Sequence, residues 1–383
     1  MQKLYETEEK AKRAFLVSLV TRKPDGREES LCRELRGLAE TLGLEIAGHE
    51  TVHVRNRQPK FGMGTGKAGE LAKRAVELEA DCMVFDWDPS PSQQRDWEEL
   101  AGISVVDRQE LIIRIFADRA NTREAELQIK LAELLYLLPR LSHKYIDLSR
   151  QRGGSYGTRG AGETRLETDR RQIERRIQRL QKELEELRKQ RQLRRRQRER
   201  QGLPVCAIVG YTNAGKSSLL NALTGADVPV GDKLFATLDA TTRRFEPEPG
   251  MAALLTDTVG FIRRLPHSLI KAFRSTLEEA ALAELLIHVL DAAEPDIESF
   301  FETTLSVLRE LGAEDIPMIT VLNKIDRVTA LPSTAESALR IEDLLLRFPE
   351  SVALSAKNGT GLDELKKRIA FLLKEPRTIV SFA

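Results

Sequence analysis

The segment Gly210–Ser217 reads Gly-Tyr-Thr-Asn-Ala-Gly-Lys-Ser, which satisfies the G-x-x-x-x-G-K-[ST] pattern of a phosphate-binding loop. Glycines at these positions let backbone N–H groups turn inward toward phosphate oxygens, and the start of the following helix adds a partial positive charge. We expect Lys216 to reach the β- and γ-phosphates and the Ser217 hydroxyl to bind Mg²⁺. The loop residues assigned to the nucleotide are Gly210, Tyr211, Thr212, Asn213, Ala214, Gly215, Lys216, Ser217 and Ser218.

A second motif, Asp257-Thr258-Val259-Gly260, lies downstream of this loop. An aspartate that ends a strand can hold the Mg²⁺ shell, here through Ser217 and water, and Gly260 offers a backbone N–H to a γ-phosphate. The Asp-x-x-Gly pattern is short, and it becomes informative because it follows a phosphate-binding loop. Together the two motifs predict a magnesium–nucleotide site.

Thr237 lies between these two motifs. A threonine in this position can bind Mg²⁺ only while a γ-phosphate is present, which is how nucleotide switches order a segment. Thr241 and Thr242 compete for the same role. We assign the metal to Ser217, Thr237 and Asp257, and catalytic roles to Lys216, Thr237 and Gly260.

The motif Asn323-Lys324-Ile325-Asp326 identifies the base. The Asp326 carboxylate can accept hydrogen bonds from the N1–H and N2–H₂ groups of guanine. Adenine lacks both donors, and a buried carboxylate left unpaired costs roughly 1–3 kcal/mol or more. Asn323 is expected to tie this motif to the phosphate-binding loop, and Ser355-Ala356-Lys357 to close over the base. The base-binding residues are therefore Asn323, Lys324, Asp326, Ser355, Ala356 and Lys357, and GTP is the predicted substrate with GDP as product.

Two further positions bear on the rate of hydrolysis. Ras-type enzymes place a water-orienting glutamine just after Asp-x-x-Gly, whereas this chain has Phe261 and then Ile262. We therefore expect slow intrinsic hydrolysis that a partner or another group accelerates. Asn213 is a candidate ligand for a monovalent cation, K⁺, beside the phosphates, and its alternative role is to stabilise the loop.

Each motif follows a short apolar run of the kind found in buried parallel strands. The runs are Val205–Val209, Ala252–Leu255, Met318–Leu322 and Val352–Leu354. Because parallel strands end at one edge of a sheet, the motifs should meet there. This pattern predicts a P-loop GTPase domain with a mostly parallel sheet over residues 203–376.

The chain upstream has 202 residues organised in two ways. Residues 1–121 alternate apolar runs with amphipathic stretches, which predicts a small α/β domain with a largely parallel sheet. The expected strands are Phe15–Val20, Cys82–Phe85 and Ser104–Val106, and the expected helices Ser30–Leu42 and Leu111–Phe116.

Residues 122–202 indicate an antiparallel helical hairpin around the glycine-rich loop Gly153–Gly162. The second helix carries a coiled-coil-like seam from Leu166 to Leu187, with apolar residues at spacings of seven, four and three. The seam fits either an intramolecular hairpin or a dimer. Arg188–Arg200 holds eight Lys or Arg and one Glu, so it is either a solvated helix face or a contact for nucleic-acid phosphates.

The composition argues against several classes of protein, including disulfide-rich, zinc-binding and membrane-spanning ones. The 383-residue chain has a formal net charge of +1 and three widely separated cysteines, Cys32, Cys82 and Cys206, which argues against a disulfide framework or a zinc site. Its five histidines form no metal-ligand pattern. The charged stretch Met1–Ala14 has no signal-peptide character, and no run approaches the roughly 20 apolar residues of a membrane span. We expect a cytoplasmic monomer.

The ordered guanine-nucleotide motifs, together with the segment Asp257–Ile262, resemble the HflX family of translation-factor-related GTPases, in the Obg–HflX group. Upstream segments strengthen the resemblance over nearly the whole chain. They are Gly62–Lys67, Pro91–Arg95, Asp107-Arg108, Leu138–Leu141 and Gly160–Thr164.

This resemblance implies an N-terminal HflX domain, a helical hairpin and a GTPase domain, here followed by a short tail at 377–383. It also implies binding to the large ribosomal subunit and its rRNA, with ribosome dissociation or rescue, often under stress. Asn213 matches the loop asparagine of relatives activated by potassium. Some relatives are reported to bind ATP through the N-terminal region, but Gly62–Gly69 lacks the residues of a phosphate-binding loop, so a tight turn or an RNA contact is favoured there.

Two other functions compete with the ribosomal one. A regulatory GTPase could bind a protein partner through the hairpin seam Leu166–Leu187. A tRNA-modification GTPase would need an additional cofactor-binding module, of which the sequence gives no sign. The sequence leaves open which step of translation is served.

Overall fold

The computed structural model describes residues 13–20, 28–141, 159–199, 202–228, 231, 234–238, 240–264, 279–329 and 334–374. Contacts divide the chain into two compact units. The first comprises Met1–Asp118 with Leu127–Glu183, and the second Arg119–Glu126 with Leu184–Ala383. The boundaries cross both helices of the middle region, so each of these helices belongs partly to each unit.

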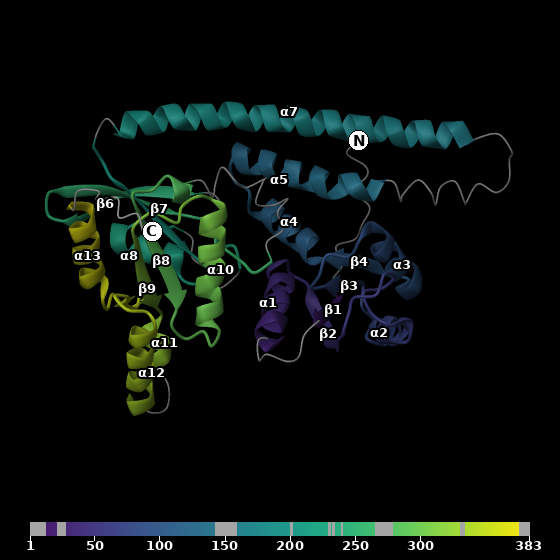
Figure 1. The fold of residues 1–383 in the computed structure, drawn as a ribbon, viewed down its shortest axis with the longest axis horizontal. Helices are drawn as coiled ribbons and strands as arrows, with labels where there is room; N and C mark the ends of the chain where they lie inside the picture. The colour runs from purple at the N-terminus through teal and green to yellow at the C-terminus, as the bar shows by residue number, and fades with distance from the viewer. Residues whose placement is uncertain are drawn as a thin grey trace. The chain divides into compact units, whose positions relative to one another are not determined.

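The first unit is built on a four-stranded sheet in the order β2-β1-β3-β4, with every pair parallel (Figure 1). The two inner strands read as continuous apolar runs because both of their faces are buried. The strands are β1 (Arg13–Val20), β2 (Glu45–His53), β3 (Cys82–Phe85) and β4 (Ser104–Asp107). The helices are α1 (Glu28–Thr41), α2 (Thr65–Glu77), α3 (Pro91–Ala101) and α4 (Arg108–Arg119).

The segment Pro91–Arg95 is the first part of α3, and its sequence explains why the helix starts there. Ser90 and Gln93 form a capping box, and Pro91 occupies the first helical turn, where its missing N–H costs nothing. Gly102 ends the helix with a left-handed φ of 69°. Trp97, fully buried on the inner face of α3, donates through Nε1 to the Phe61 carbonyl and packs edge-on against Phe61 and Phe85.

The middle region contains α5 (Arg123–Leu137), a short 3₁₀ turn η2 (Leu138–Arg140) and α7 (Arg159–Glu199). α5 and α7 run antiparallel, because Glu124 near the start of α5 pairs with Arg191 late in α7, while Glu133 further along α5 faces Arg176 earlier in α7. Ile177 of the predicted seam is buried, as is Leu180. The middle region is thus a helical pair. Residues 142–158, which include most of the glycine-rich loop, lie outside the described residues.

The second unit contains a six-stranded sheet in the order β10-β9-β8-β5-β7-β6, parallel except for the edge strand β6 (Figure 1). Its strands are β5 (Val205–Gly210), β6 (Thr241–Glu248), β7 (Met251–Asp257), β8 (Leu285–Asp291), β9 (Met318–Asn323) and β10 (Val352–Ala353). Its helices are α8 (Lys216–Thr224), α10 (Ile297–Glu310), α11 (Ile325–Thr329), α12 (Thr334–Arg347) and α13 (Leu362–Lys374).

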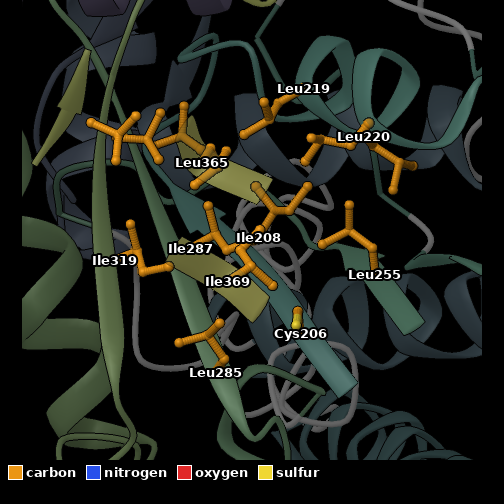
Figure 2. Close-up of a cluster of buried hydrophobic side chains, with 14 of the residues drawn as sticks. Cys206, Ile208, Leu219, Leu220, Leu255, Leu285, Ile287, Ile319, Leu365 and Ile369 are labelled. Atoms are coloured by element: carbon orange, nitrogen blue, oxygen red, sulfur yellow. The ribbon is translucent and has the colours of Figure 1, made fainter. Parts of the chain in front are cut away.

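Alternate residues of the inner strands form the core of this sheet. Figure 2 shows Ile208, Ile287 and Ile319 of three neighbouring strands pointing toward side chains from α8 and α13. Leu219 and Leu365 are the helical partners labelled nearby, and all of these residues are buried to 2% exposure or less. This core holds the strand ends of one sheet edge at fixed positions.

The predicted fold class is confirmed: an α/β domain with a parallel sheet, a helical pair, and a GTPase domain with a mostly parallel sheet. No described helix is both long enough and apolar enough to cross a bilayer. The predicted C-terminal tail, residues 377–383, lies outside the described residues, and the domain boundaries placed at 121, 202 and 376 stay predictions.

Candidate active site

The motif residues follow strand ends at one edge of the GTPase sheet. β5 ends at Gly210, β7 at Asp257 and β9 at Asn323. A cavity of about 360 Å³ opens at this edge. It is lined by Thr212, Asn213, Gly215, Lys216, Ser217, Ser218, Gly231, Phe235, Ala236, Thr237, Gly260, Asn323, Lys324, Asp326, Arg327, Ala356 and Lys357. The assigned residues absent from this lining are Gly210, Tyr211, Ala214, Asp257 and Ser355.

The glycines of the motifs stand where a side chain would collide with another segment. A Cβ on Gly210 would lie 2.3 Å from the Val289 carbonyl oxygen. On Gly215, where φ is 92°, it would lie 2.4 Å from Asn323 Nδ2. On Gly260 it would lie 2.8 Å from Thr212 Cα and 2.9 Å from Lys216 Nζ. All three positions therefore need glycine for close approach, and Gly210 and Gly215, which have a positive φ, need it for backbone freedom as well.

Lys216 lies inside the phosphate-binding loop rather than extending into solvent. It is 6% exposed, and its Nζ donates to the Tyr211 carbonyl oxygen at 2.8 Å. The pKa of Lys216 is lowered to about 8, chiefly by burial; Asp257 opposes the shift and Lys324 adds to it. A bound polyphosphate would add negative charge beside Nζ and so stabilise the charged ammonium.

Three oxygen-bearing side chains meet at the cavity, where Ser217 and Thr237 form part of the lining. Ser217 Oγ donates to Asp257 Oδ2 at 2.6 Å, Thr237 Oγ1 lies 2.7 Å from Ser217 Oγ, and Thr237 Oγ1 donates to Asp257 Oδ2 at 3.0 Å. Burial raises the pKa of Asp257, while Lys216 and the two hydroxyl groups oppose the rise. Asp257 Oδ1 is also buried and has no hydrogen-bond partner among the described residues.

The donor set of this cluster fits a hard divalent cation. Hydroxyl and carboxylate oxygens are the ligands that Mg²⁺ prefers, usually together with water and phosphate oxygens. The unpartnered Asp257 oxygen is a further acceptor in a buried position, where a missing partner is costly. The competing threonines are both on β6. Thr241 pairs with Asp257 in the sheet but does not line the cavity, and Thr242 Oγ1 lies 3.0 Å from Thr256 Oγ1.

The base-binding motifs are tied to the phosphate-binding loop from the other side of the cavity. Asn323 Nδ2 donates to the Ala214 carbonyl oxygen at 2.9 Å, and Asn323 Oδ1 accepts from the Ala356 N–H at 3.0 Å. Lys324 Nζ donates to the Asn213 carbonyl oxygen at 2.6 Å. The side chains of Asn323 and Lys324 therefore both hold the phosphate-binding loop.

Asp326 is held in place by Ser355, the first residue of the motif Ser355-Ala356-Lys357. Ser355 Oγ donates to Asp326 Oδ1 at 2.6 Å, and the Asn358 N–H donates to Ser355 Oγ at 3.2 Å. Ala356 and Lys357 border the cavity beside Asp326. A carboxylate fixed in this way can present its second oxygen to a base edge.

Sequence reasoning did not assign four residues that line the cavity, Gly231, Phe235, Ala236 and Arg327, and it also missed Asp291. Asp291 ends β8 at the same edge, and its Oδ2 accepts from Lys324 Nζ at 2.8 Å. The apolar run Leu285–Leu290 before it was a signal that could have found it. Phe235 lines the cavity, is 2% exposed and has a left-handed φ of 57°, which is rare for a bulky residue and has no signature in sequence.

The predicted RNA contacts are only partly within the described chain. In the basic stretch Arg188–Arg200, Arg191 forms ion pairs with Glu124 and with Glu279. The positive charge of this arginine is therefore already neutralised by carboxylates of the second unit. The side chains of 194–200 and the residues 153–158 of the glycine-rich loop lie outside the described part.

Three family models match successive parts of the chain. A model described as GTP-binding GTPase N-terminal matches residues 29–117, and one described as GTP-binding GTPase middle region matches residues 119–198. A model described as 50S ribosome-binding GTPase matches residues 205–324.

Whole-chain similarity extends to characterised relatives. The chain is 48% identical to the GTPase HflX of Akkermansia muciniphila over 95% of this chain and 85% of the relative. It is 40% identical to the GTPase HflX of Escherichia coli over 87% and 76%, respectively. A GTP-binding protein of the archaeon Sulfolobus solfataricus, solved with GDP, is 26% identical over 94% of this chain and 98% of that one, with a TM-score of 0.46.

Proposed function

The chain belongs to the HflX family of GTPases, and from this premise we propose that it is a nucleotide switch that binds the large ribosomal subunit and its rRNA and dissociates or rescues ribosomes. It hydrolyses GTP to GDP and phosphate. We further propose that it acts as a cytoplasmic monomer, often under stress.

The observation that carries the proposal is that similarity runs through all three regions of the chain. A GTPase domain alone supports only nucleotide chemistry, because one fold hosts many functions. Here the N-terminal and middle regions match their own family models, and the relative from Akkermansia aligns over 95% of the chain. The parts that would contact a ribosome are therefore shared with the family, together with the part that hydrolyses GTP.

We assign the nucleotide roles on the geometry of the cavity. Lys216 and the loop backbone would bind the phosphates, Gly260 would offer its N–H to the γ-phosphate, and Asp326 would read guanine. Ser217, Thr237 and Asp257 would hold Mg²⁺, which neutralises charge on the phosphates when bound. Thr237 would join this set only in the GTP state, and its release after hydrolysis would change the surface that a partner sees.

Slow intrinsic hydrolysis follows from what stands after Gly260. Phe261 and Ile262 are each 1% exposed and have no polar atom in their side chains to orient water. The missing group would come from the large subunit or from a conformation induced by it. We therefore propose that the ribosome stimulates hydrolysis.

A monovalent cation is the second cofactor in this proposal. Asn213 lines the cavity with a left-handed φ of 60°, and its carbonyl oxygen accepts from Lys324 Nζ. Its amide oxygen would bind K⁺ beside the phosphates. Exchange of KCl for NaCl at equal ionic strength should then lower the hydrolysis rate of the wild type and leave Asn213→Ala at one low rate in both salts.

The experiment is co-sedimentation with purified large subunits, comparing a non-hydrolysable GTP analogue with GDP. We expect binding with the analogue, little binding with GDP, and loss of analogue-dependent binding in Lys216→Ala. Rising salt should weaken the complex steeply because charged contacts to phosphates release counterions. Absence of binding in both nucleotide states would remove the ribosomal role and favour a regulatory GTPase that binds a protein through the hairpin.

A further inference from the structure

Tyr211, the second residue of the phosphate-binding loop, contacts three functional segments at once. Its carbonyl oxygen accepts from Lys216 Nζ at 2.8 Å. Its hydroxyl oxygen accepts from the backbone N–H of Arg263 at 2.8 Å, and its ring stacks on Phe300 of α10 at 3.8 Å with an interplanar angle of 2°. The side chain is 4% exposed, so these contacts are made away from solvent.

Arg263 completes the same arrangement from the segment after Gly260. Its guanidinium group lies 4.6 Å from the Phe300 ring centroid and forms an ion pair of 2.8 Å with Asp296. Asp296 is the residue immediately before α10. Arg263 is 8% exposed, and a guanidinium stacked on an aromatic ring and paired with a carboxylate has one favoured orientation.

The backbone at Phe261, between Gly260 and Arg263, is also paired with the phosphate-binding loop. The Phe261 N–H donates to the Gly210 carbonyl oxygen at 3.0 Å, and the Thr212 N–H donates to the Phe261 carbonyl oxygen at 2.8 Å. Gly260 approaches the loop so closely that a Cβ there would meet Thr212. The turn Gly260–Arg263 is therefore fixed at its start by backbone pairing and at its end by the Tyr211 hydroxyl.

We propose that Tyr211 and Arg263 are positioning residues for GTP hydrolysis, which latch the turn Gly260–Arg263 to the phosphate-binding loop and to α10. The latch sets where the Gly260 N–H and the two apolar residues after it stand relative to the γ-phosphate. The same contacts give α10 a direct connection to the nucleotide state through Phe300 and Asp296. This inference rests on the proposed role of Gly260 and is independent of the ribosomal role.

The test compares Tyr211→Phe with the wild type by steady-state GTP hydrolysis and by equilibrium binding of GDP. The substitution keeps the ring that stacks on Phe300 and removes the hydroxyl that accepts from the Arg263 N–H. Because the loop backbone and the base motifs are unchanged, we expect kcat to fall about tenfold, with KM and GDP affinity within about twofold. Tyr136→Phe, the same chemical change in the first unit, serves as the control and should leave both quantities unchanged.

A second variant, Asp296→Asn, loosens the latch from α10 without touching the loop. It should lower kcat in the same direction by a few-fold, and it keeps the proposal testable if Tyr211→Phe folds poorly. A kcat within twofold of wild type in folded Tyr211→Phe or Asp296→Asn would overturn the latch. So would an equal loss of GTP and GDP affinity in Tyr211→Phe, because that result would mean that Tyr211 only shapes the loop. Gly260→Ala is the reference for the underlying assignment, since full activity in it would refute the role of Gly260 itself.

Discussion

Gly62–Gly69 of the N-terminal domain and Gly210–Ser217 of the GTPase domain are both glycine-rich, carry a lysine and lead into a helix. Their lysines differ in environment. Lys216 is 6% exposed and bonds a carbonyl oxygen of its own loop. Lys67 is exposed on α2 and forms an ion pair of 3.1 Å with Glu70 one turn away. Lys67 is thus paired at the surface, whereas Lys216 is enclosed by its own loop.

The glycines differ in the same way. Gly215 and Gly260 each exclude a Cβ by contact with another motif, whereas a Cβ on Gly64, Gly66 or Gly69 would meet no described atom within 4 Å. Gly62 favours glycine through its left-handed φ of 74°, but a Cβ there would make only ordinary contact with Trp87 at 3.6 Å. Spacing of residue types therefore does not by itself make a phosphate site. A phosphate site also needs neighbouring segments that approach the loop, which the carboxyl edge of the GTPase sheet supplies.

The largest expected effect is the difference in GTP hydrolysis between the Lys216 variant and the Lys67 variant. Lys216→Ala removes a donor to the phosphates, and we expect GTP hydrolysis to fall about 100-fold or more. Lys67→Ala removes only a surface ion pair and should change hydrolysis by less than about twofold. Steady-state GTP hydrolysis assays of both variants measure this difference. ATP binding that survives Lys216→Ala but is lost in Lys67→Ala would show that the N-terminal loop is a phosphate site as well.

The next largest effect is expected on guanine nucleotide affinity when Asp326 is replaced. Asp326→Asn replaces a carboxylate that would accept two hydrogen bonds with an amide that can accept only at its oxygen. Guanine nucleotide affinity should fall about 10- to 100-fold, at about tenfold per 1.4 kcal/mol. Isothermal titration calorimetry with GDP measures this affinity. The control is Glu298→Gln, which makes the same change of charge at an exposed side chain of α10 and is expected to bind GDP like the wild type.

A smaller effect is expected at Gly215. Gly215→Ala would combine a left-handed φ of 92° with a Cβ 2.4 Å from Asn323 Nδ2. We expect a loss of at least about 1–2 kcal/mol in the free energy of unfolding, because alanine there is both strained and crowded. Denaturant titration of the nucleotide-free protein would give this value, and unchanged stability would mean that the close approach is not structurally important.

The smallest effect has the opposite sign. Gly66 lies within the first turn of α2 with free space around it, so Gly66→Ala should stabilise the protein by about 0.5–1 kcal/mol through helix propensity. The same titration applies. A destabilised Gly66→Ala would show that the N-terminal loop, too, requires glycine, and the contrast between the loops would fail.

The sequence predicted most strands of the two sheets but missed β2, β6 and β8. Inner strands such as β5 and β9 are buried on both faces and read as apolar runs, and β8 reads the same way except for the buried His288 in its middle. β2 and β6 lie at the sheet edges, and β6 reads Thr-Thr-Arg-Arg-Phe-Glu-Pro-Glu. An edge strand with one face in solvent needs few apolar residues, so its pattern is weak.

The same distinction applies to the site. The guanine-nucleotide motifs were predictable because residue type and order along the chain define their chemistry. Phe235 and Arg263 were not, because their roles depend on which segments meet in space: the backbone of Phe235 is left-handed only in the folded chain, and Arg263 reaches Tyr211 across 52 residues.

Measuring the hydrolysis rate as a function of large-subunit concentration tests whether the ribosome stimulates this GTPase. We expect slow turnover by the protein alone, a saturable increase of at least about tenfold with large subunits, and no increase in Lys216→Ala. Fast turnover without a partner, or a rate that large subunits leave unchanged, would contradict this expectation.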